Sequence, residues 1–244
     1  MHKISKTIIY AGILCVAGTT SFAAVIQNFD SGNISLGNSA LTYGGNAGPS
    51  AGCASNSALY GEGTYAVTSS ASSCHSLWAP TGPQSSPYFM AVNGSSLASQ
   101  ANIYSQTVAT GIIAGQTFNF SGFFSGLYSV GAANLVLKVY DGTGTSGTLL
   151  GSSAFTTNLA TPAGSNPAQF PASWVQQSVG FTALSSTVTV QVFSASTIAG
   201  GNDFGLDTLA IVQTSNGTTS ATPEPASFFL AGSALLGLAM IRRK

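Results

Sequence analysis

The chain has 244 residues, of which 44% are hydrophobic and 5% are charged, and its formal net charge is zero. This neutrality hides an uneven distribution, because residues 24–222 contain one base, Lys138, against five acidic residues. A segment with a net charge of −4 and a single cation cannot neutralise a phosphate backbone. Nucleic acid is therefore excluded as a partner, and anionic lipid surfaces are poor partners for the same reason.

The N-terminus has the three parts of a secretory signal peptide, which we place at residues 1–23. Lys3 and Lys6 form a basic start, an apolar run covers residues 7–18, and Ser21-Phe22-Ala23 has the small-x-small pattern that precedes cleavage. The apolar run is shorter than the roughly 20 residues of a bilayer span. An uncleaved anchor or a buried helix is the alternative.

Residues 24–213 are predicted to form one all-β domain, because short alternating segments are separated by Gly, Ser and Asn turns and no amphipathic helix is evident. Residues 187–193 show the alternation most clearly, with Val188, Val190 and Val192 on one face. About eight to ten such strands predict a β-sandwich. The predicted strands are 25–29, 64–68, 88–92, 103–108, 117–124, 135–140, 174–181, 187–193 and 204–212, with a hairpin and an extended loop between 141 and 173.

Two cysteines remain after export, Cys53 and Cys74. An oxidising compartment favours a disulfide between them. The closed loop would restrict the unfolded chain by roughly 3 kcal/mol in the chain-entropy model. Two free thiols are the alternative.

The order of the segments is similar to that of the jelly-roll domains related to carbohydrate-binding modules and galactose-binding-like domains. The residues that carry the resemblance include Thr64-Tyr65-Ala66-Val67, Met90-Ala91-Val92-Asn93-Gly94 and, most specifically, Asn202-Asp203-Phe204-Gly205-Leu206-Asp207. The resemblance implies a jelly-roll β-sandwich with one structural calcium, bound where the first and last strands meet by Asp30 and Asp207. In the family a glutamate usually follows this type of phenylalanine, whereas Asp30 stands here. The alternative is that aspartates of this motif cap and bridge loops.

A sugar-binding domain of this kind needs aromatic platforms. Trp78 and Tyr88 flank a proline-rich loop, and we predict that they are exposed and bind the ligand; packing in the protein interior is the alternative. Trp174 starts an alternating strand, so core packing is expected for it.

The residues of a catalytic site are missing from the sequence. The ectodomain has one histidine, His75, and one glutamate, Glu62, and it lacks a nucleophile elbow and a zinc-binding cluster. We therefore expect no enzyme, but a non-catalytic glycan-binding or matrix-associated module. One alternative is a structural or adhesive matrix protein without a defined ligand. The least favoured alternative is a hydrolase, which would need a cleft joining Glu62 or Asp141 to another carboxylate.

The C-terminus contains a stalk rich in Ser and Thr at 214–222, followed by Pro223-Glu224-Pro225, an uncharged apolar run at 226–241 and Arg242-Arg243-Lys244. The prolines mark the entry to a helix, and the apolar run predicts a short transmembrane helix with its basic end in the cytoplasm.

This arrangement at 223–244 resembles the PEP-CTERM sorting signal of Gram-negative bacteria. The resemblance implies an exosortase, a transpeptidase-like membrane protease, as a partner. The protein would be exported, anchored in the inner membrane by its C-terminal helix, cut near the Pro-Glu-Pro motif, and passed to the cell envelope or an extracellular polysaccharide matrix. An anchor that is never cut is the alternative.

Overall fold

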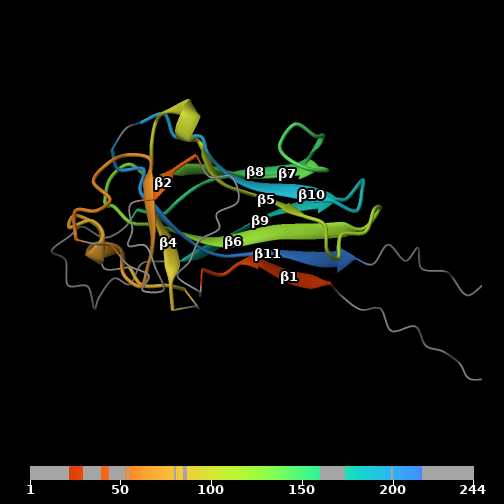
Figure 1. The fold of residues 1–244 in the computed structure, drawn as a ribbon, viewed down its shortest axis with the longest axis horizontal. Coiled ribbons are helices and arrows are strands. Elements are labelled where there is room, and N and C mark those ends of the chain that lie inside the picture. The colour runs from red at the N-terminus through yellow and green to blue at the C-terminus, as the bar shows by residue number, and fades with distance from the viewer. Residues whose placement is uncertain are drawn as a thin grey trace, which may run out of the picture.

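The computed structural model describes residues 22–29, 40–43, 53, 55–79, 81–84, 87–159, 174–198 and 200–215. These residues form two β-sheets that lie one above the other, as Figure 1 shows. All strand pairs are antiparallel except that of β2 (Thr42–Tyr43) with β3 (Thr64–Thr68). The predicted all-β class is confirmed, and the two sheets agree with a sandwich. The predicted signal peptide up to residue 21, the stalk from residue 216 and the C-terminal helix lie outside the described residues.

The seven-stranded sheet has the order β2-β3-β4-β11-β6-β9, with β1 also paired to β11, and the four-stranded sheet has the order β5-β10-β7-β8. The remaining bounds are β1 Ala23–Gln27, β4 Phe89–Asn93, β5 Asn102–Val108, β6 Thr117–Gly126, β7 Asn134–Asp141, β8 Leu149–Thr156, β9 Val175–Thr182, β10 Val188–Ser194 and β11 Phe204–Ser215. Two short 3-10 turns are η1 (Ala71–Ser73) and η2 (Ala98–Gln100).

Every predicted strand is present at or near its expected position. Between 141 and 173, where a hairpin and a loop were predicted, the described residues hold one strand, β8, which pairs with β7. The structure also contains one strand that the sequence did not predict, β2. Its two residues are too few to show an alternation, and it joins the sheet through a parallel pairing with β3.

The main core lies between the two sheets and follows from the alternation. Val188, Val190 and Val192 of β10 are completely buried, and Phe118 and Phe120 of β6 are buried against them in the same cluster. Burying a side chain of this size stabilises the fold by about 1.5–3 kcal/mol.

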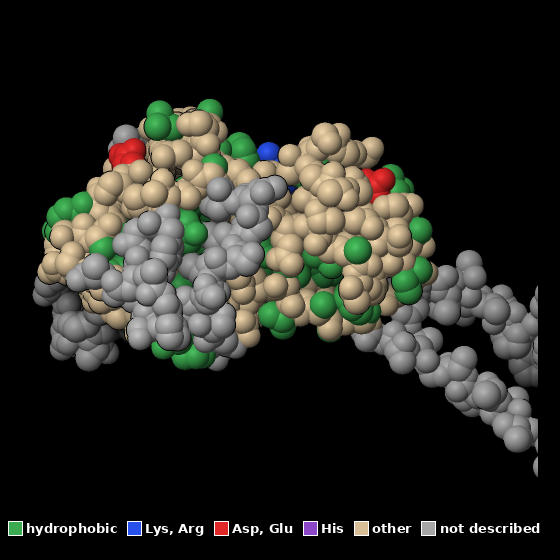
Figure 2. Space-filling model, in the orientation of Figure 1, with side chains coloured by type: hydrophobic (Ala, Val, Ile, Leu, Met, Phe, Trp, Pro, Cys, Tyr) green, Lys and Arg blue, Asp and Glu red, His purple; other side chains and the backbone are tan. Residues whose placement is uncertain are grey.

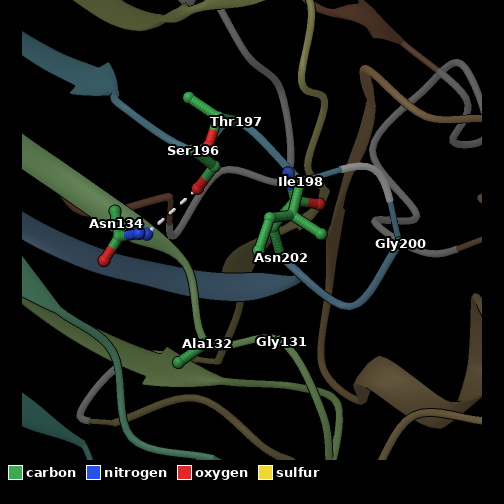
Figure 3. A pocket seen from close by; sticks show the side chains of 8 residues that line it. All are labelled: Gly131, Ala132, Asn134, Ser196, Thr197, Ile198, Gly200 and Asn202. Atoms are coloured by element: carbon green, nitrogen blue, oxygen red, sulfur yellow. Dashed lines mark hydrogen bonds between the residues drawn. The ribbon is translucent and has the colours of Figure 1, made fainter.

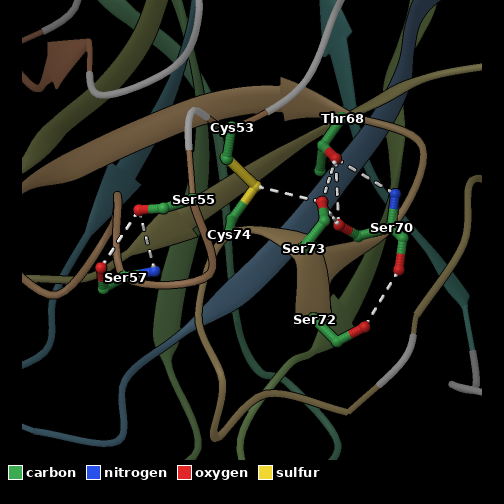
Figure 4. Close-up of a disulfide and its surroundings, with 8 residues drawn as sticks. All are labelled: Cys53, Ser55, Ser57, Thr68, Ser70, Ser72, Ser73 and Cys74. Carbon is green, nitrogen blue, oxygen red and sulfur yellow. Dashed lines mark hydrogen bonds between the residues drawn. A yellow bond between two sulfur atoms is a disulfide. The ribbon is translucent and has the colours of Figure 1, made fainter.

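A second cluster covers the outer side of β3 and β4. Ala66 and Phe89 point away from the main core and pack with Leu59, Cys74 and Trp78, which belong to the long connections before β3 and after it. The predicted disulfide joins Cys53 to Cys74, whose Cα atoms are 5.0 Å apart. Figure 4 shows this bond beside Ser73, whose Oγ lies 3.8 Å from Cys74 Sγ. The disulfide therefore ties these two connections together over the sheet.

The first and last described strands run side by side. Ala23 of β1 pairs with Val212 of β11, and the backbone N–H of Gln213 donates a 2.8 Å hydrogen bond to the carbonyl oxygen of Phe22. Both described ends of the domain therefore lie at the same end of the sandwich (Figure 1).

Candidate functional site

The outer face of the four-stranded sheet gathers polar and aromatic side chains, and we call it the open face. It is built from the residues of β7 and β10 that alternate with core residues, because successive side chains of a strand point to opposite faces. Lys138 and Tyr140 alternate with the buried Leu137 and Val139. In the sheet register, Gln191 of β10 lies opposite Lys138 of β7 on one side and opposite Ser105 of β5 on the other. We define the open face by these residues: Ser105, Lys138, Tyr140, Thr189, Gln191 and Phe193.

The open face is bordered by two raised segments. The loop between β7 and β8 folds over the start of β10, where Gly144 N–H donates to Thr189 Oγ1 and the Thr189 hydroxyl donates to the Gly142 carbonyl, both at 2.8 Å. Figure 1 shows this loop and η2 standing above the sheet at its two ends. In Figure 2 the upper outline dips between these raised parts, and the blue of a Lys or Arg side chain shows in the dip. Lys138 is the only base among the described residues.

Hydrogen bonds hold the side chains of this face in place. Gln191 Nε2 donates to Asn102 Oδ1 at 3.0 Å, and the Tyr140 hydroxyl donates to Gln191 Oε1 at 3.5 Å. Burial raises the pKa of Tyr140. Lys138 Nζ lies 3.8 Å from the centroid of the Phe193 ring, which is a cation–π contact. The face thus presents a phenol, an aromatic ring and an ammonium group, and the buried amide of Gln191 holds the phenol in place.

Sequence reasoning did not single out the open face as a site. The signal was present, because Lys138 and Gln191 stand at the non-core positions of alternating strands. That alternation cannot show whether a loop will cover such a face. Thr189 and Gln191 are only 1% and 6% exposed because of the loop and the neighbouring amide, although both point away from the core.

The predicted exposure of Trp78 is wrong. Its side chain is 1% exposed, its indole Nε1 donates a 2.8 Å hydrogen bond to Asp203 Oδ2, and its ring stacks on His75 with 4.9 Å between centroids. Its rings pack in the second cluster, so Trp78 offers no platform to a sugar. Tyr88 is half-buried against the main core, and its role as a ligand residue stays a prediction.

Trp174 packs as expected. Its ring meets Phe89 edge-to-face with 5.4 Å between centroids, and its Nε1 donates to the Gly82 carbonyl at 3.0 Å.

Asp203 is a buried carboxylate with two donors. Trp78 Nε1 and the Gly94 N–H, the latter at 3.3 Å, donate to its two oxygens. Removal from water raises the pKa of Asp203 to about 6, although both hydrogen bonds oppose the shift and Glu62 adds a small further rise. Because its side chain is only 6% exposed, the Asp203 carboxyl is closed to a substrate and serves to join loops.

Of the two predicted calcium ligands, the structure describes Asp207 but not Asp30. Asp207 is fully buried, and its two oxygens accept hydrogen bonds from Gln84 N–H at 2.9 Å and the Thr208 hydroxyl at 3.1 Å. A carboxylate is a suitable ligand for calcium, because hard cations prefer oxygen atoms. In the described part of the chain, however, no group of three His, Cys, Asp or Glu residues gathers as a metal site. The calcium site stays a prediction.

Comparison with known proteins gives one family match. A model described as the PEP-CTERM protein-sorting motif matches residues 221–244. No curated protein matches the sequence. Among the described residues, no helix is long and apolar enough to cross a membrane, and the predicted span at 226–241 is not among them.

Several solved structures are similar to this chain. The tandem CBM22-1–CBM22-2 domain of Paenibacillus barcinonensis Xyn10C has 13% identity and a TM-score of 0.46, over 85% of this chain and 50% of that one. The C-terminal domain of EclA, a sugar-binding protein, has 20% identity and a TM-score of 0.35, over 46% of this chain and 66% of that one, just under two thirds. TmCBM61 in complex with β-1,4-galactotriose has 13% identity and a TM-score of 0.36, over 61% and 81% of the two chains.

Proposed function

We propose that this chain is an exported surface or matrix protein whose β-sandwich is a non-catalytic glycan-binding module. The open face supports the proposal. It combines the phenol of Tyr140, the ring of Phe193 and the ammonium group of Lys138 on one side of a single sheet, between two raised segments. Sugars present hydroxyl groups that both donate and accept, together with apolar ring faces, and this set of side chains matches both features.

The match at residues 221–244 supports the export part of the proposal. The segment at 226–241 would hold the chain in the inner membrane until an exosortase-type membrane protease cuts near Pro223-Glu224-Pro225. The protein would then pass to the cell envelope or to an extracellular polysaccharide matrix, where a nearly uncharged surface avoids unspecific ionic contacts.

Binding to polysaccharide tests the proposal. The full chain, solubilised in detergent, is passed over immobilised extracellular polysaccharide from its own host, with calcium and with a chelator. We expect saturable retention that falls about tenfold or more in Tyr140→Ala, which corresponds to the loss of about 1.4 kcal/mol of contact. Tyr60→Ala is the matched control, because Tyr60 is 52% exposed but contacts His75 in the connections that cover the other sheet.

Two results would contradict the proposal. If folded, disulfide-bonded protein is not retained in either condition, the structural or adhesive alternative becomes the better one. If Tyr60→Ala loses retention and Tyr140→Ala keeps it, the open face is not the binding surface.

A further inference from the structure

A small pocket lies at the end of the sandwich where β7 begins and β10 ends. Its volume is about 20 Å³. The loop before β7 forms one wall and the loop between β10 and β11 forms the other, as Figure 3 shows. The residues that the argument uses are Gly131, Ala132 and Asn134 on the first side and Ser196, Ile198 and Asn202 on the second.

Asn202 is the unusual residue of this pocket. Its side chain is 3% exposed, yet among the described residues neither Oδ1 nor Nδ2 has a hydrogen-bond partner. An unsatisfied buried polar group costs about 1–3 kcal/mol, so folded proteins rarely keep one without a purpose. Two other polar side chains nearby are engaged: Asn134 N–H donates to Ser196 Oγ at 3.0 Å, and Thr156 Oγ1 donates to Asn134 Oδ1 at 2.8 Å.

Glycines let the walls of the pocket approach each other closely, because they have no side chain. A Cβ on Gly201 would lie 2.3 Å from the Val130 carbonyl oxygen, and one on Gly94 would lie 2.5 Å from Asn202 Oδ1. Gly201 also has a φ of +87°, which side chains disfavour. The two loops therefore approach as closely as their backbones allow.

We propose that the Asn202 pocket is a subsite that binds one hydroxyl group of a neutral sugar or polyol. Both amide atoms are buried, so the amide must turn toward the pocket before one hydroxyl can donate to Oδ1 and accept from Nδ2. The volume agrees, because a water-sized group needs about 10–15 Å³. None of the described lining residues is charged, which favours a neutral group over a carboxylate or an ammonium.

This inference extends the proposed glycan binding to a place outside the open face. A site built to hydrogen-bond a hydroxyl discriminates against ligands that lack it, because the amide is then left unpaired. The pocket would thus supply selectivity among sugars, while the flat side chains of the open face supply contact area.

The test uses the full chain in deuterated detergent with ¹⁵N-labelled asparagine. The Asn202 side-chain amide signal is identified by its loss in Asn202→Ala and is followed while galactose, glucose, mannose or xylose is added in turn. We expect a saturable shift of this signal with at least one sugar, and at least a tenfold weaker affinity for that sugar in both Asn202→Ala and Asn202→Leu. No saturable shift with any of the four sugars overturns the proposal.

Thermal stability separates a binding role from a structural one. Asn202→Leu removes the unpaired amide but keeps a similar shape, so the Tm should rise by about 2–4 °C while sugar affinity falls. Asn93→Leu is the matched control, because buried Asn93 donates to the Leu59 carbonyl at 2.6 Å and its Tm should fall. A lower Tm with unchanged sugar affinity in Asn202→Leu would show a structural amide and would overturn the proposal.

The two proposals can fail separately. Retention of polysaccharide without a shift of the Asn202 signal would leave the glycan-binding function standing and refute the subsite. A saturable shift with a monosaccharide, but no retention on polysaccharide, would support the subsite and refute the module as proposed.

Discussion

The indole of Trp78 and the carboxylate of Asp203 are joined by a buried 2.8 Å hydrogen bond across 125 positions of sequence. Asp203 stands just before β11, at the centre of the larger sheet, and Trp78 anchors the disulfide-linked connections that cover β3 and β4. The bond therefore joins the covering segment to the sheet, and it does so with a group that titrates.

The stability of the fold should depend on the protonation of Asp203. Its pKa is raised to about 6 in the folded protein from an ordinary value of 3.8, so the protonated form is the one that folding favours. The stabilisation is complete below pH 4 and is lost as the pH rises through 6, by about 3 kcal/mol at most. Denaturant unfolding followed by tryptophan fluorescence at pH 4, 5, 6 and 7 measures this slope.

Asp203→Asn is the control for that slope. The amide cannot accept from both Trp78 and Gly94, so we expect a loss of about 1–3 kcal/mol at low pH. The pH-dependent fall contributed by Asp203 should disappear. Equal slopes for both proteins would contradict the assignment.

Thr189 should hold the loop between β7 and β8 in place at the border of the open face. Thr189 is 1% exposed, and its hydroxyl bonds Gly142 and Gly144 of the loop between β7 and β8 and also lies 3.0 Å from Thr107 Oγ1. Thr189→Val preserves the shape but leaves two backbone groups unpaired, at a cost of about 1–3 kcal/mol. We expect faster amide exchange at Gly144 and weaker polysaccharide retention. Thr182→Val, at an exposed position of β9, should change neither. Unchanged exchange at Gly144 in Thr189→Val would show that the loop holds without this hydroxyl.

Calcium should stabilise the protein if Asp30 and Asp207 share an ion. Thermal unfolding in millimolar calcium and in excess chelator measures the effect. At a calcium concentration 100 times Kd, binding to the folded state alone contributes about 2.7 kcal/mol. Asp30→Asn should remove the difference between the two conditions. An equal Tm with calcium and chelator in the wild type would refute the predicted site.

Processing of the C-terminal signal should change the mass of the protein in its host. We expect the mature protein to end near Pro223-Glu224-Pro225, as measured by mass spectrometry of the intact chain. A Glu224→Ala variant should accumulate as a membrane-bound precursor that keeps residues 226–244. Full-length protein as the only species in wild-type cells would support the alternative of an uncut anchor.

Local patterns predicted the strands well because their cause is local. Val188, Val190 and Val192 alternate with polar residues, and a period of two decides which side chains reach the core wherever the strand pairs. The cysteine pair was predictable for another reason, since Cys53 and Cys74 are the only cysteines between the two predicted targeting segments.

The predictions that failed depend on partners that are distant in sequence. Trp78 stands next to a proline-rich loop and was expected at the surface, but it is buried and bonded to Asp203, which is 125 residues away in sequence. Gln191 stands at a non-core position of its strand, and only the folded chain brings Asn102 and Tyr140 around its amide. The unpaired amide of Asn202 was equally hidden, because it depends on two loops that meet only in the folded chain.

The direction of β11 also decides how far the proposed binding surfaces would stand from the cell. Ser215, at the end of β11, is followed by the stalk and the sorting signal, whereas Asn202 precedes the start of the same strand. The twelve residues of β11 span about 40 Å at 3.3 Å per residue. While the tail is still anchored, the strand would act as a spacer that places the Asn202 pocket at the far end of the domain. A polymer could then be captured before it reaches the lipid headgroups.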